Sequence, residues 1–493
     1  MRLSKIVEAV QGKVLTDSEW DREIYSLSVD SRKCGKGGLF ICLKGNNSDS
    51  HLYAAEAVKN GAVAVLTERK LVLNVPQILV QDTRLALSYT ASLFYGEPSK
   101  KLKIIGITGT NGKTTVSYML SSILQAAGKK VGVIGTLGIR YGRTEIPSML
   151  TTPDPIELNK TLAEMLLYGT EYVVMEVSAH ALYYKKTAGI VFSACIFTNL
   201  TQDHLDFFEN MDAYKNAKSR LFTESICPLA VLNGDDSTGR CFGGMREERK
   251  GKTVFYGLNT PSDAFAVITD EGLKSSSFML NLNDQLCRVD LRLTGRHNVY
   301  NALAAATCAR ELGVGIFDIA KGLESLKEVK GRLQAVANYQ GAEIYVDFAH
   351  TPDGLQKSLS SLRQYCKGRL ICLFGCGGNR DKSKRAIMGE TAAKTADFCI
   401  LTSDNPRYED PLDIISEIER GYRRFSVRYV VVPDRKRAID YGLDFLKKDD
   451  VFLIAGKGGE EYQEIMGIKY PFNDQDIIEK LIKRKGESDF FKT

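Results

Sequence analysis

A glycine-rich segment around residue 110 has the residue types of a phosphate-binding loop. It reads GITGTNGKTT from Gly106 to Thr115, between an apolar run at 103–108 and an amphipathic run at 113–127. Glycines allow backbone N–H groups to surround an anion, and the first turn of a helix adds partial positive charge. The lysine of such a loop reaches the β- and γ-phosphates of a nucleotide, and the hydroxyl after it can bind Mg²⁺. The segment therefore predicts a nucleotide site made of Gly109, Thr110, Asn111, Gly112, Lys113, Thr114 and Thr115. An ordinary strand-to-helix turn is the alternative, which the Gly-Lys-Thr-Thr ending disfavours.

Four of the five histidines lie in segments that also carry acidic or amide side chains. Glu176 belongs to MEVSAHAL (175–182) and His204 to TNLTQDHLD (198–206), and each segment includes or follows a strand-like run. A carboxylate and an imidazole at the mouth of a sheet can hold a Mg²⁺ ion that also contacts phosphate. A histidine after a strand can equally be a structural residue, so this pattern alone leaves both interpretations open.

The elements that must position these residues alternate between strands and helices. From Leu102 onward, apolar runs that end in polar residues or glycine alternate with helical spacers, and the pattern restarts near residue 333. Such alternation is typical of parallel sheets covered by helices on both faces, in which ligands bind beyond the carboxyl ends of the strands. A more polar insertion at about 250–292 interrupts the pattern.

We expect an α/β protein of three domains, as a length of 493 residues suggests. These are a small α/β N-terminal domain at 1–100, a central P-loop domain with a doubly wound, mostly parallel sheet at 101–332, and a Rossmann-like α/β C-terminal domain at 333–493.

The composition is that of a soluble globular protein. The net charge is +6 and lysine and arginine form only short runs, so no nucleic-acid-binding surface is expected. The eleven cysteines have no CxxC pair and no zinc-ligand spacing, which indicates reduced thiols in a cytoplasmic enzyme. No apolar segment approaches the length of a membrane span, and the first residues lack the apolar core of a secretory signal, so neither membrane insertion nor export is expected.

The glycine-rich loop departs from the common GxxxxGK pattern, because Ile107 stands where that pattern has its first glycine. The variant TGTNGKTT resembles the loop of the Mur ligase and folylpolyglutamate synthetase group. Further segments resemble Mur ligase motifs in the same order, namely MEVSAHAL, TNLTQDHLD, YKNAKSRLF (214–222), GRHNVYNALAA (295–305), GRLQ (331–334) and VDFAHTPD (346–353). In the last two, Gln334 replaces a glutamate and Phe348 a tyrosine. The chain thus resembles the Mur ligases, which form amide bonds at the expense of ATP in bacterial cell-wall synthesis.

The resemblance implies where ATP and metal ions bind. Besides the loop, the ATP contacts would be His297, Asn298, Asn301, Arg332, Asp347 and His350. Two Mg²⁺ ions would have Thr114, Glu176 and His204 among their ligands. Lys113, Lys218 and His204 would be the catalytic residues, and Lys218 would be carbamylated (N6-carboxylysine). A plain surface lysine is the alternative at position 218.

The N-terminal segments SVDSR (28–32) and GGLFICLKG (37–45) resemble the uridine-diphosphate-binding region of the family members that add the third and fourth peptide residues. The TTPD segment (151–154) resembles the motif that holds the nucleotide sugar in the members that add the third. The implied contacts of a UDP-N-acetylmuramoyl dipeptide are Ser31, Thr151, Thr152, Ser178 and Lys186. Lys186 replaces an arginine of the family pattern and Tyr184 a glutamine. A lysine still meets a diphosphate as a point charge, but it lacks the two-pronged hydrogen bonding of arginine.

The segment SDNPRYEDP (403–411) bears on the amino acid that is added. In this family the DNPR sequence marks members that accept meso-diaminopimelate, whose far end carries a carboxylate as well as an ammonium group. The guanidinium of Arg407 can hold that carboxylate with two parallel hydrogen bonds, and an unpaired arginine would disfavour lysine. The implied pocket consists of Arg380, Asp404, Asn405, Arg407, Gly456 and Glu460. Asn379 and Gly459 replace an aspartate and a histidine beside it, and L-lysine or another diamino acid stays the alternative substrate.

The implied reaction is activation of the dipeptide carboxylate by ATP as an acyl phosphate, followed by attack of the amino-acid amine. Closure of the domains about a hinge near Gly331 would assemble the site, and a monomer is expected. A folylpolyglutamate-type ligase is a second hypothesis, which the TTPD and DNPR segments disfavour. A third is a P-loop ATPase or nucleotide-binding regulator without ligase activity.

Overall fold

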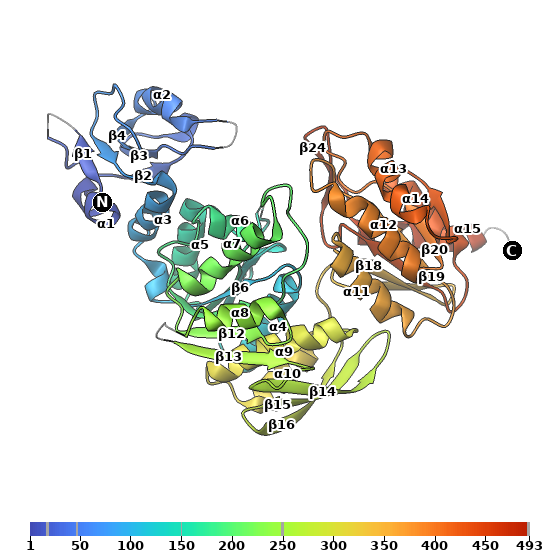
Figure 1. Ribbon diagram of the computed structural model, residues 1–493. Coiled ribbons are helices and arrows are strands. Elements are labelled where there is room, and N and C mark those ends of the chain that lie inside the picture. The colour runs from blue at the N-terminus through green and yellow to red at the C-terminus, as the bar shows by residue number, and fades with distance from the viewer. Residues whose placement is uncertain (16–18, 46–47, 149, 248–250, 491–493) are drawn as a thin grey trace. The chain divides into compact units, whose positions relative to one another are not determined.

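The computed structural model describes residues 1–15, 19–45, 48–148, 150–247 and 251–490 (Figure 1). The chain divides into two compact units. The first consists of Met1–Gly106, Lys130–Cys195 and Ala217–Leu229, and the second of Ile107–Lys129, Ile196–Asn216 and Ala230–Thr493. None of the helices in the described ranges has the length and apolar character needed to cross a membrane.

The N-terminal residues form a five-stranded sheet in the order β1-β5-β4-β3-β2. β1 pairs with β5 in antiparallel fashion, and the other pairs are parallel. Alternate side chains of β3 enter two apolar clusters, Leu39 and Ile41 on one face and Phe40 on the other. Both faces are therefore covered, as expected of a parallel sheet. The elements are α1 (Leu3–Val10), β1 (Lys13–Leu15), β2 (Ser26–Ser28), η1 (Ser31–Lys33), β3 (Gly38–Ile41), η2 (Ser50–Tyr53), α2 (Ala54–Lys59), β4 (Ala62–Thr67), β5 (Gln77–Leu79), α3 (Thr83–Phe94) and η3 (Pro98–Lys100).

An eleven-stranded sheet follows, in the order β16-β15-β14-β13-β12-β11-β6-β10-β7-β8-β9. β10 and β7 are parallel, whereas β7-β8-β9 is an antiparallel meander. The strands are β6 (Lys103–Thr108), β7 (Val131–Gly135), β8 (Gly138–Tyr141), β9 (Thr144–Ile146), β10 (Tyr172–Glu176), β11 (Phe192–Phe197), β12 (Leu229–Asn233), β13 (Lys252–Gly257), β14 (Ala264–Glu271), β15 (Ser276–Leu282) and β16 (Gln285–Leu291). The helices are α4 (Lys113–Ala126), α5 (Pro155–Leu167), α6 (Ala179–Tyr183), α7 (Met211–Thr223), α8 (Ser237–Gly244), α9 (Arg296–Glu311) and α10 (Ile316–Ser325).

The polar insertion that the sequence marks at about 250–292 is part of this sheet, because it supplies β13 to β16. β14, β15 and β16 pair in antiparallel fashion, and α9 and α10 contact them. Along β14 buried Ala264 and Ala266 alternate with exposed Phe265 and Val267. An antiparallel sheet tolerates one solvent-facing side, so strands of this kind carry more polar residues than the buried parallel strands.

The C-terminal residues form a six-stranded sheet in the order β17-β18-β22-β19-β20-β21, parallel except for β17. One apolar cluster packs α11, α12 and α13 against one face, and a second packs α14 and α15 against the other. This is the predicted doubly wound arrangement. The elements are β17 (Gln334–Tyr339), β18 (Ala342–Asp347), α11 (Pro352–Arg363), β19 (Leu370–Phe374), α12 (Ser383–Thr395), β20 (Phe398–Leu401), α13 (Pro411–Tyr422), β21 (Arg428–Val431), α14 (Arg435–Phe445), β22 (Val451–Ala455), β23 (Tyr462–Ile465), β24 (Ile468–Pro471) and α15 (Asp474–Phe490).

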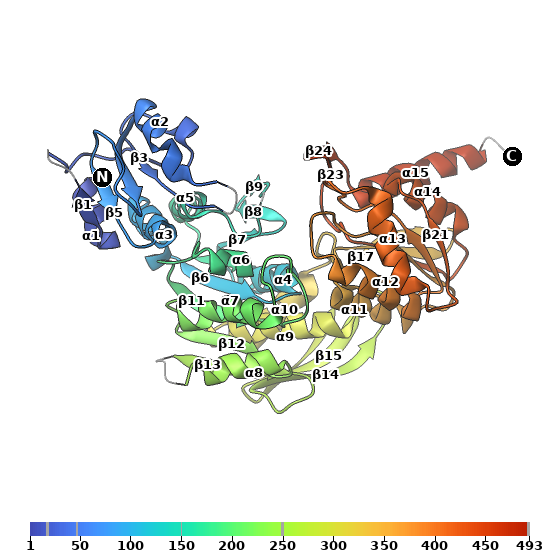
Figure 2. The same ribbon diagram turned by 45° about the horizontal axis from the view of Figure 1, so that its top comes forward.

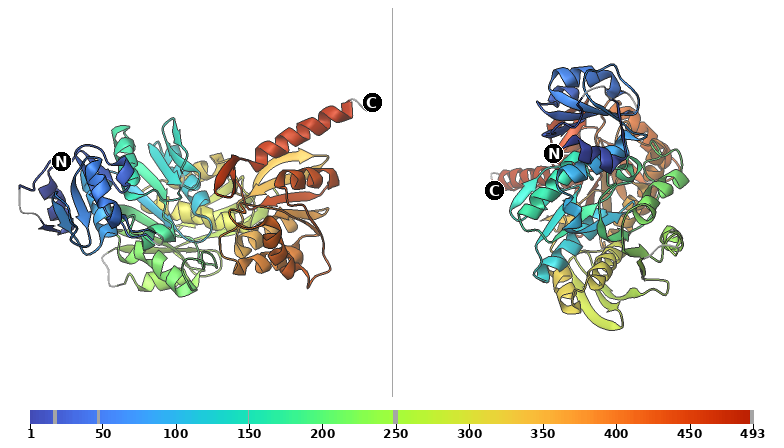
Figure 3. Two further views of the ribbon diagram at one scale, coloured as in Figure 1. Left: turned by 90° about the horizontal axis from the view of Figure 1, so that it is seen from above. Right: turned by 90° about the vertical axis from the view of Figure 1, so that its left-hand side faces the viewer.

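α15 is tied to this sheet by a buried ion pair at its first turn, and it continues past the sheet in Figure 3. Arg435 donates from Nε and Nη2 to the two carboxylate oxygens of Asp474 at 2.8 Å each, and both side chains are 0% exposed. Nη2 of Arg435 also donates to the carbonyl of Ala455 at the end of β22, at 2.9 Å.

Removal of the carboxylate from this pair leaves an uncompensated buried charge. We therefore expect Asp474→Ala to lower the free energy of unfolding by about 3–5 kcal/mol, measured by urea denaturation followed by circular dichroism. The control is Glu390→Ala, which breaks the exposed pair with Lys394 (2.7 Å) and costs about 0.5 kcal/mol or less. Equal denaturation midpoints for the two variants would contradict the prediction.

Candidate active site

The glycine-rich loop joins β6 to α4 and has the strand–loop–helix geometry that the sequence predicts. Gly109 and Gly112 have φ angles of +148° and +87°, in a region that side chains disfavour. A Cβ on Gly109 would lie 1.9 Å from Oγ1 of Thr198, and a Cβ on Gly112 would lie 2.4 Å from Oδ1 of Asn301. Glycine is therefore required at both positions, and Asn301 of α9 lies against the loop.

The cationic and hydroxyl groups of the loop are held in place by neighbours in the second unit. Nζ of Lys113 donates to the carbonyl oxygens of Gly109 (2.9 Å) and Thr110 (2.8 Å). Nη2 of Arg332 donates to Oγ1 of Thr114 at 2.9 Å, and the Arg332 guanidinium stacks on the ring of Phe348 at 4.2 Å. The structure thus brings Arg332, a predicted ATP contact 218 residues further along the chain, to the start of α4.

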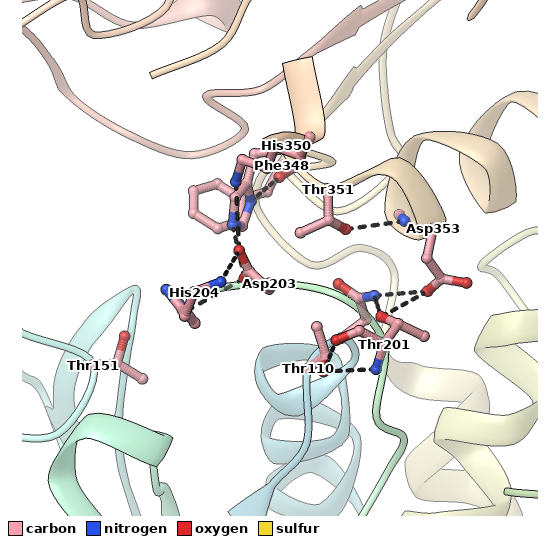
Figure 4. A network of polar contacts seen from close by, with 12 residues as sticks. Thr110, Thr151, Thr201, Asp203, His204, Phe348, His350, Thr351 and Asp353 are labelled. Atoms are coloured by element: carbon pink, nitrogen blue, oxygen red, sulfur yellow. Dashed lines mark hydrogen bonds and ion pairs between the residues drawn. The ribbon is translucent and has the colours of Figure 1, made fainter. Parts of the chain in front are cut away.

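Asn111 connects the loop to two residues that the sequence did not single out. Its Nδ2 donates to Oδ2 of Asp353 at 2.8 Å and to Oγ1 of Thr201 at 3.4 Å. Asp353 also accepts from Nζ of Lys357 at 2.8 Å, and Figure 4 shows Thr201 and Asp353 beside Thr110. Asp353 is the last residue of the VDFAHTPD motif, so its position in that motif was a signal for its place near the loop.

Asp203 lies between two predicted site histidines, and sequence reasoning missed it (Figure 4). Its carboxylate lies 3.3 Å from Nε2 of His204, 3.7 Å from Nε2 of His350 and 3.4 Å from Nζ of Lys384. Burial alone would raise the pKa of Asp203, but the nearby groups of His350, His204 and Lys384 hold that pKa well below its usual range. Asp203 is therefore an anion that holds both rings. Its place directly before His204 was the available signal.

The remaining predicted ATP residues of the second unit have defined partners. Nδ2 of Asn301 donates to Oδ1 of Asn298 at 3.1 Å. Burial lowers the pKa of the His297 ring to about 4, so the ring is neutral near pH 7. Asp347, at the end of β18, accepts from the backbone N–H groups of Leu333 (2.6 Å) and Ala349 (3.0 Å). The carboxylate of Asp347 thus holds the residue before β17 and the segment after β18.

In the first unit, the predicted sugar-binding hydroxyls lie around Glu176, at the end of β10. Its Oε1 accepts from the backbone N–H of Thr136 (2.9 Å) and its Oε2 accepts from the Thr136 hydroxyl (3.0 Å), which contacts the Thr151 hydroxyl at 3.1 Å. Oγ1 of Thr152 donates to the carbonyl of Glu176 (3.0 Å) and accepts from the backbone N–H of Ser178 (3.0 Å). The structure thus brings Thr151, Thr152, Glu176 and Ser178 together.

The other predicted residues of the first unit lie on different elements. Nζ of Lys186 pairs with Asp154, the aspartate of the TTPD segment, at 2.7 Å. Ser31 is buried beside α2, where its hydroxyl donates to Glu56 at 2.7 Å. Lys218, on α7, is only 1% exposed. The plain surface lysine is therefore ruled out at this position, because burial of an ammonium group requires a special environment.

Oxygen and imidazole groups of the kinds that bind Mg²⁺ stand at the predicted positions, with Thr114 and His204 in the second unit and Glu176 in the first. Within the described ranges, no group of three or more His, Cys, Asp or Glu side chains is arranged to hold a metal ion.

The two predicted arginine clamps of the amino-acid pocket flank Gly377. A Cβ on Gly377 would lie 2.9 Å from Nη1 of Arg407 and 3.6 Å from Cγ of Arg380. Arg407 has a φ of +52°, and its Nη1 donates to the carbonyl of Gly378 at 2.8 Å. Arg380 and Arg407 thus both lie against Gly377.

Acidic and amide groups stand beside these arginines. Nδ2 of Asn405 donates to Oε2 of Glu460 at 2.9 Å, and Lys457 donates to both residues, at 3.0 and 2.9 Å. Oδ2 of Asp404 is buried without a hydrogen-bond partner among the described residues, and a Cβ on Gly456 would lie 2.5 Å from it. Sequence reasoning missed Lys457, whose position between two glycines after β22 was a signal.

The residues that depart from the family pattern fit their sites. Asn379 has a φ of +51°, which asparagine tolerates, and its Oδ1 accepts from the backbone N–H of Tyr408 at 3.0 Å. Oε1 of Gln334 accepts from the backbone N–H of Gly331 at 2.8 Å. A Cβ on Gly331 would lie 1.9 Å from the backbone nitrogen of Gly459, so the two backbones are in contact at the predicted hinge.

Comparison with known proteins agrees with these motifs. The model of the Mur ligase middle domain matches residues 107–309, that of the Mur ligase glutamate ligase domain matches 331–458, and that of the Mur ligase family catalytic domain matches 23–95. The UDP-N-acetylmuramoyl-L-alanyl-D-glutamate--2,6-diaminopimelate ligase of Caldanaerobacter subterraneus is 42% identical over 484 residues, which are 98% of this chain and 99% of that protein. The enzyme of the same name from Geobacillus thermodenitrificans is 39% identical over 470 residues, 94% and 96% of the two chains.

Solved structures show the same similarity. A structure of a UDP-N-acetylmuramoyl-L-alanyl-D-glutamate--2,6-diaminopimelate ligase has a TM-score of 0.71 and 30% identity, and the match covers 99% of each chain. The fold is also that of the MurF ligase of Thermotoga maritima in complex with ADP, with a TM-score of 0.62, 21% identity, and coverage of 95% of this chain and 98% of that one. The three domain models and the identity over nearly the whole length lead to one conclusion: the chain belongs to the Mur ligase family.

Proposed function

We propose that the chain is an ATP-dependent ligase that adds meso-diaminopimelate to UDP-N-acetylmuramoyl-L-alanyl-D-glutamate, a step in peptidoglycan precursor synthesis. The curated relatives named above carry this activity in their names and span nearly the whole chain. The observation that carries the choice of amino acid is the pairing of Arg380 and Arg407 around Gly377.

The charges of the pocket match both groups at the far end of diaminopimelate. Two guanidinium groups suit its carboxylate, and the buried Oδ2 of Asp404 and the carboxylate of Glu460 suit its ammonium group. L-Lysine has no carboxylate at its far end for the two guanidinium groups to bind, which disfavours it.

The chemistry follows from the family and from the groups of the loop. A carboxylate oxygen of the dipeptide attacks the γ-phosphorus of ATP, the bond to the β,γ-bridging oxygen breaks, and an acyl phosphate and ADP form. The amine of the amino acid then attacks the acyl carbon, the bond to the phosphate oxygen breaks, and the amine gives up a proton. Lys113 and the backbone N–H groups of the loop stabilise the negative charge on the transferring phosphoryl group. Two Mg²⁺ ions, held through Thr114, Glu176 and His204, would neutralise further charge on the phosphate oxygens.

Around this centre we assign the predicted binding roles. Asn301, Asn298, His297 and His350 serve ATP, while Thr151, Thr152, Ser178, Lys186 and Ser31 serve the UDP-sugar peptide. Arg332 and the Gly331 backbone, which contact Thr114 and Gly459, form the hinge between a central domain (101–332) and a C-terminal domain (333–493). A monomer in the cytoplasm is the expected working form.

We also propose that Lys218 is carbamylated. Reaction of the neutral amine with carbon dioxide converts a cation that is costly to bury into an anion that accepts hydrogen bonds. We expect Lys218→Ala to lower ligase activity by about 10²-fold, the scale of one lost group that supports catalysis. If the modification is present, we expect a small carboxylate such as acetate to restore part of the activity of this variant in the ligase assay. If acetate restores nothing while the variant keeps its melting temperature, the lysine acts without the modification.

The assay that separates a ligase from a plain ATPase measures phosphate release with each substrate omitted in turn. We expect phosphate release to require the UDP-sugar dipeptide, and sustained turnover to require the amino acid as well. Steady ATP hydrolysis in the absence of both would favour the ATPase or regulator hypothesis.

A further inference from the structure

The hairpin of β23 and β24 (Figure 2) is hydrogen-bonded to the DNPR segment, and one of its side chains contacts an arginine of that segment. The backbone N–H of Arg407 donates to the carbonyl of Glu464 at 3.1 Å, and the N–H of Met466 donates back to the carbonyl of Arg407 at 2.7 Å. The N–H of Glu464 donates to Oδ1 of Asn405 at 2.9 Å, and Nε2 of Gln463 donates to the carbonyl of Asp404 at 2.7 Å. Four hydrogen bonds therefore fix the segment from Asp404 to Arg407 on one strand.

The side chain of Glu464 contacts the guanidinium that this backbone carries. Oε2 of Glu464 accepts from Nε of Arg407 at 3.2 Å, and both side chains are partly buried, at 21% and 18% exposed. With Nη1 bonded to the carbonyl of Gly378, two of the three nitrogens are held. Among the residues that the structure describes, Nη2 has no hydrogen-bond partner.

We propose that Glu464 is a positioning residue that determines specificity: it holds the Arg407 guanidinium at Nε so that the edge carrying Nη2 faces the far carboxylate of the diamino acid. A long side chain at a positive φ otherwise samples several rotamers, and freezing them on binding costs affinity. The contact with Glu464 restricts the rotamers of Arg407 before the substrate arrives, so less side-chain entropy is lost on binding. The role rests on the proposed function, because it assumes that Arg407 binds a substrate carboxylate.

The test is a set of steady-state measurements with ATP, the UDP-sugar dipeptide and varied meso-diaminopimelate. For Glu464→Ala we expect the KM for diaminopimelate to rise about 10-fold, the scale of one lost charge-assisted hydrogen bond. The kcat and the KM values of the other two substrates should not change, since the contact orients a binding group only. Glu464→Gln, whose amide oxygen can still accept from Nε, should recover part of the affinity.

Two further variants separate positioning from a general structural effect. In an Arg407→Ala background, Glu464→Ala should have no further effect on the KM for diaminopimelate, because its target is gone. Glu461→Ala, which breaks an exposed pair with Lys330 next to the same hairpin (2.7 Å), serves as the control and should match the unsubstituted enzyme.

The outcomes distinguish this inference from the proposed function. If the unsubstituted enzyme does not join diaminopimelate, the proposed function fails. If it does, and Glu464→Ala has an unchanged KM, the positioning role is wrong while the function stands. The positioning role would also be wrong if Glu464→Ala raised the KM for diaminopimelate equally with and without Arg407. A rise in the KM of all three substrates would overturn it as well.

Discussion

Lys113→Ala is expected to abolish amide formation, with a loss in kcat of about 10³-fold, comparable to the removal of a main charge-stabilising group in other enzymes. The lysine is the cation of the glycine-rich loop, and its ammonium group is held over the carbonyl oxygens of Gly109 and Thr110. A nucleotide phosphate offers a better partner than these neutral oxygens, because a charged pair in a closed site is stronger. The measurement is the formation of UDP-sugar tripeptide under saturating substrates.

The control for Lys113→Ala is the melting temperature, which should stay close to that of the unsubstituted enzyme, because Nζ of Lys113 donates to two carbonyl oxygens of the loop itself. Near-normal turnover in a folded Lys113→Ala variant would contradict the assignment of the loop to ATP.

Replacement of Arg407 is expected to have the second large effect, and it is specific to one substrate. For Arg407→Ala we expect kcat/KM for meso-diaminopimelate to fall by about 10²- to 10³-fold, as when one partner of a buried charged pair is removed. The value for L-lysine should change little, since lysine has no carboxylate for the guanidinium to bind. The ratio of the two kcat/KM values therefore falls.

Arg407→Lys extends this test, because it keeps the charge and removes the planar fork. If two parallel hydrogen bonds matter, this variant should behave like Arg407→Ala toward diaminopimelate. An unchanged preference for diaminopimelate in both variants would mean that other residues select the amino acid.

The sequence predicted the fold class well because its strongest signals are local. β6 has the predicted bounds, 103–108, since a short apolar run before a glycine loop has few other solutions. The insertion at 250–292 was harder to interpret, because β14 to β16 expose one face and so lack the continuous apolar runs of buried parallel strands. Its place in the eleven-stranded sheet depends on long-range pairing, which no local pattern encodes.

The same distinction applies to the candidate site. Thr152, Glu176 and Ser178 lie together because Glu176 ends β10 and Ser178 follows two residues later. The hydroxyl of Thr152 bonds to the backbone of both. Asp203 and Lys384 are 181 residues apart and meet only in the folded chain. Glu464 could not be connected to Arg407 from the sequence either, since the two residues are 57 residues apart and meet only where β23 pairs with the DNPR backbone. The assigned roles of the site residues stay predictions until they are measured.

The central claim is that this ligase joins meso-diaminopimelate, rather than L-lysine, to the UDP-sugar dipeptide. The most direct measurement supplies both amino acids at equal concentration, with ATP, Mg²⁺ and UDP-N-acetylmuramoyl-L-alanyl-D-glutamate, and identifies the product by mass spectrometry. We expect the diaminopimelate-containing tripeptide to dominate. A product containing mainly lysine would contradict the account of Arg380 and Arg407, and formation of neither tripeptide would contradict the proposed function itself.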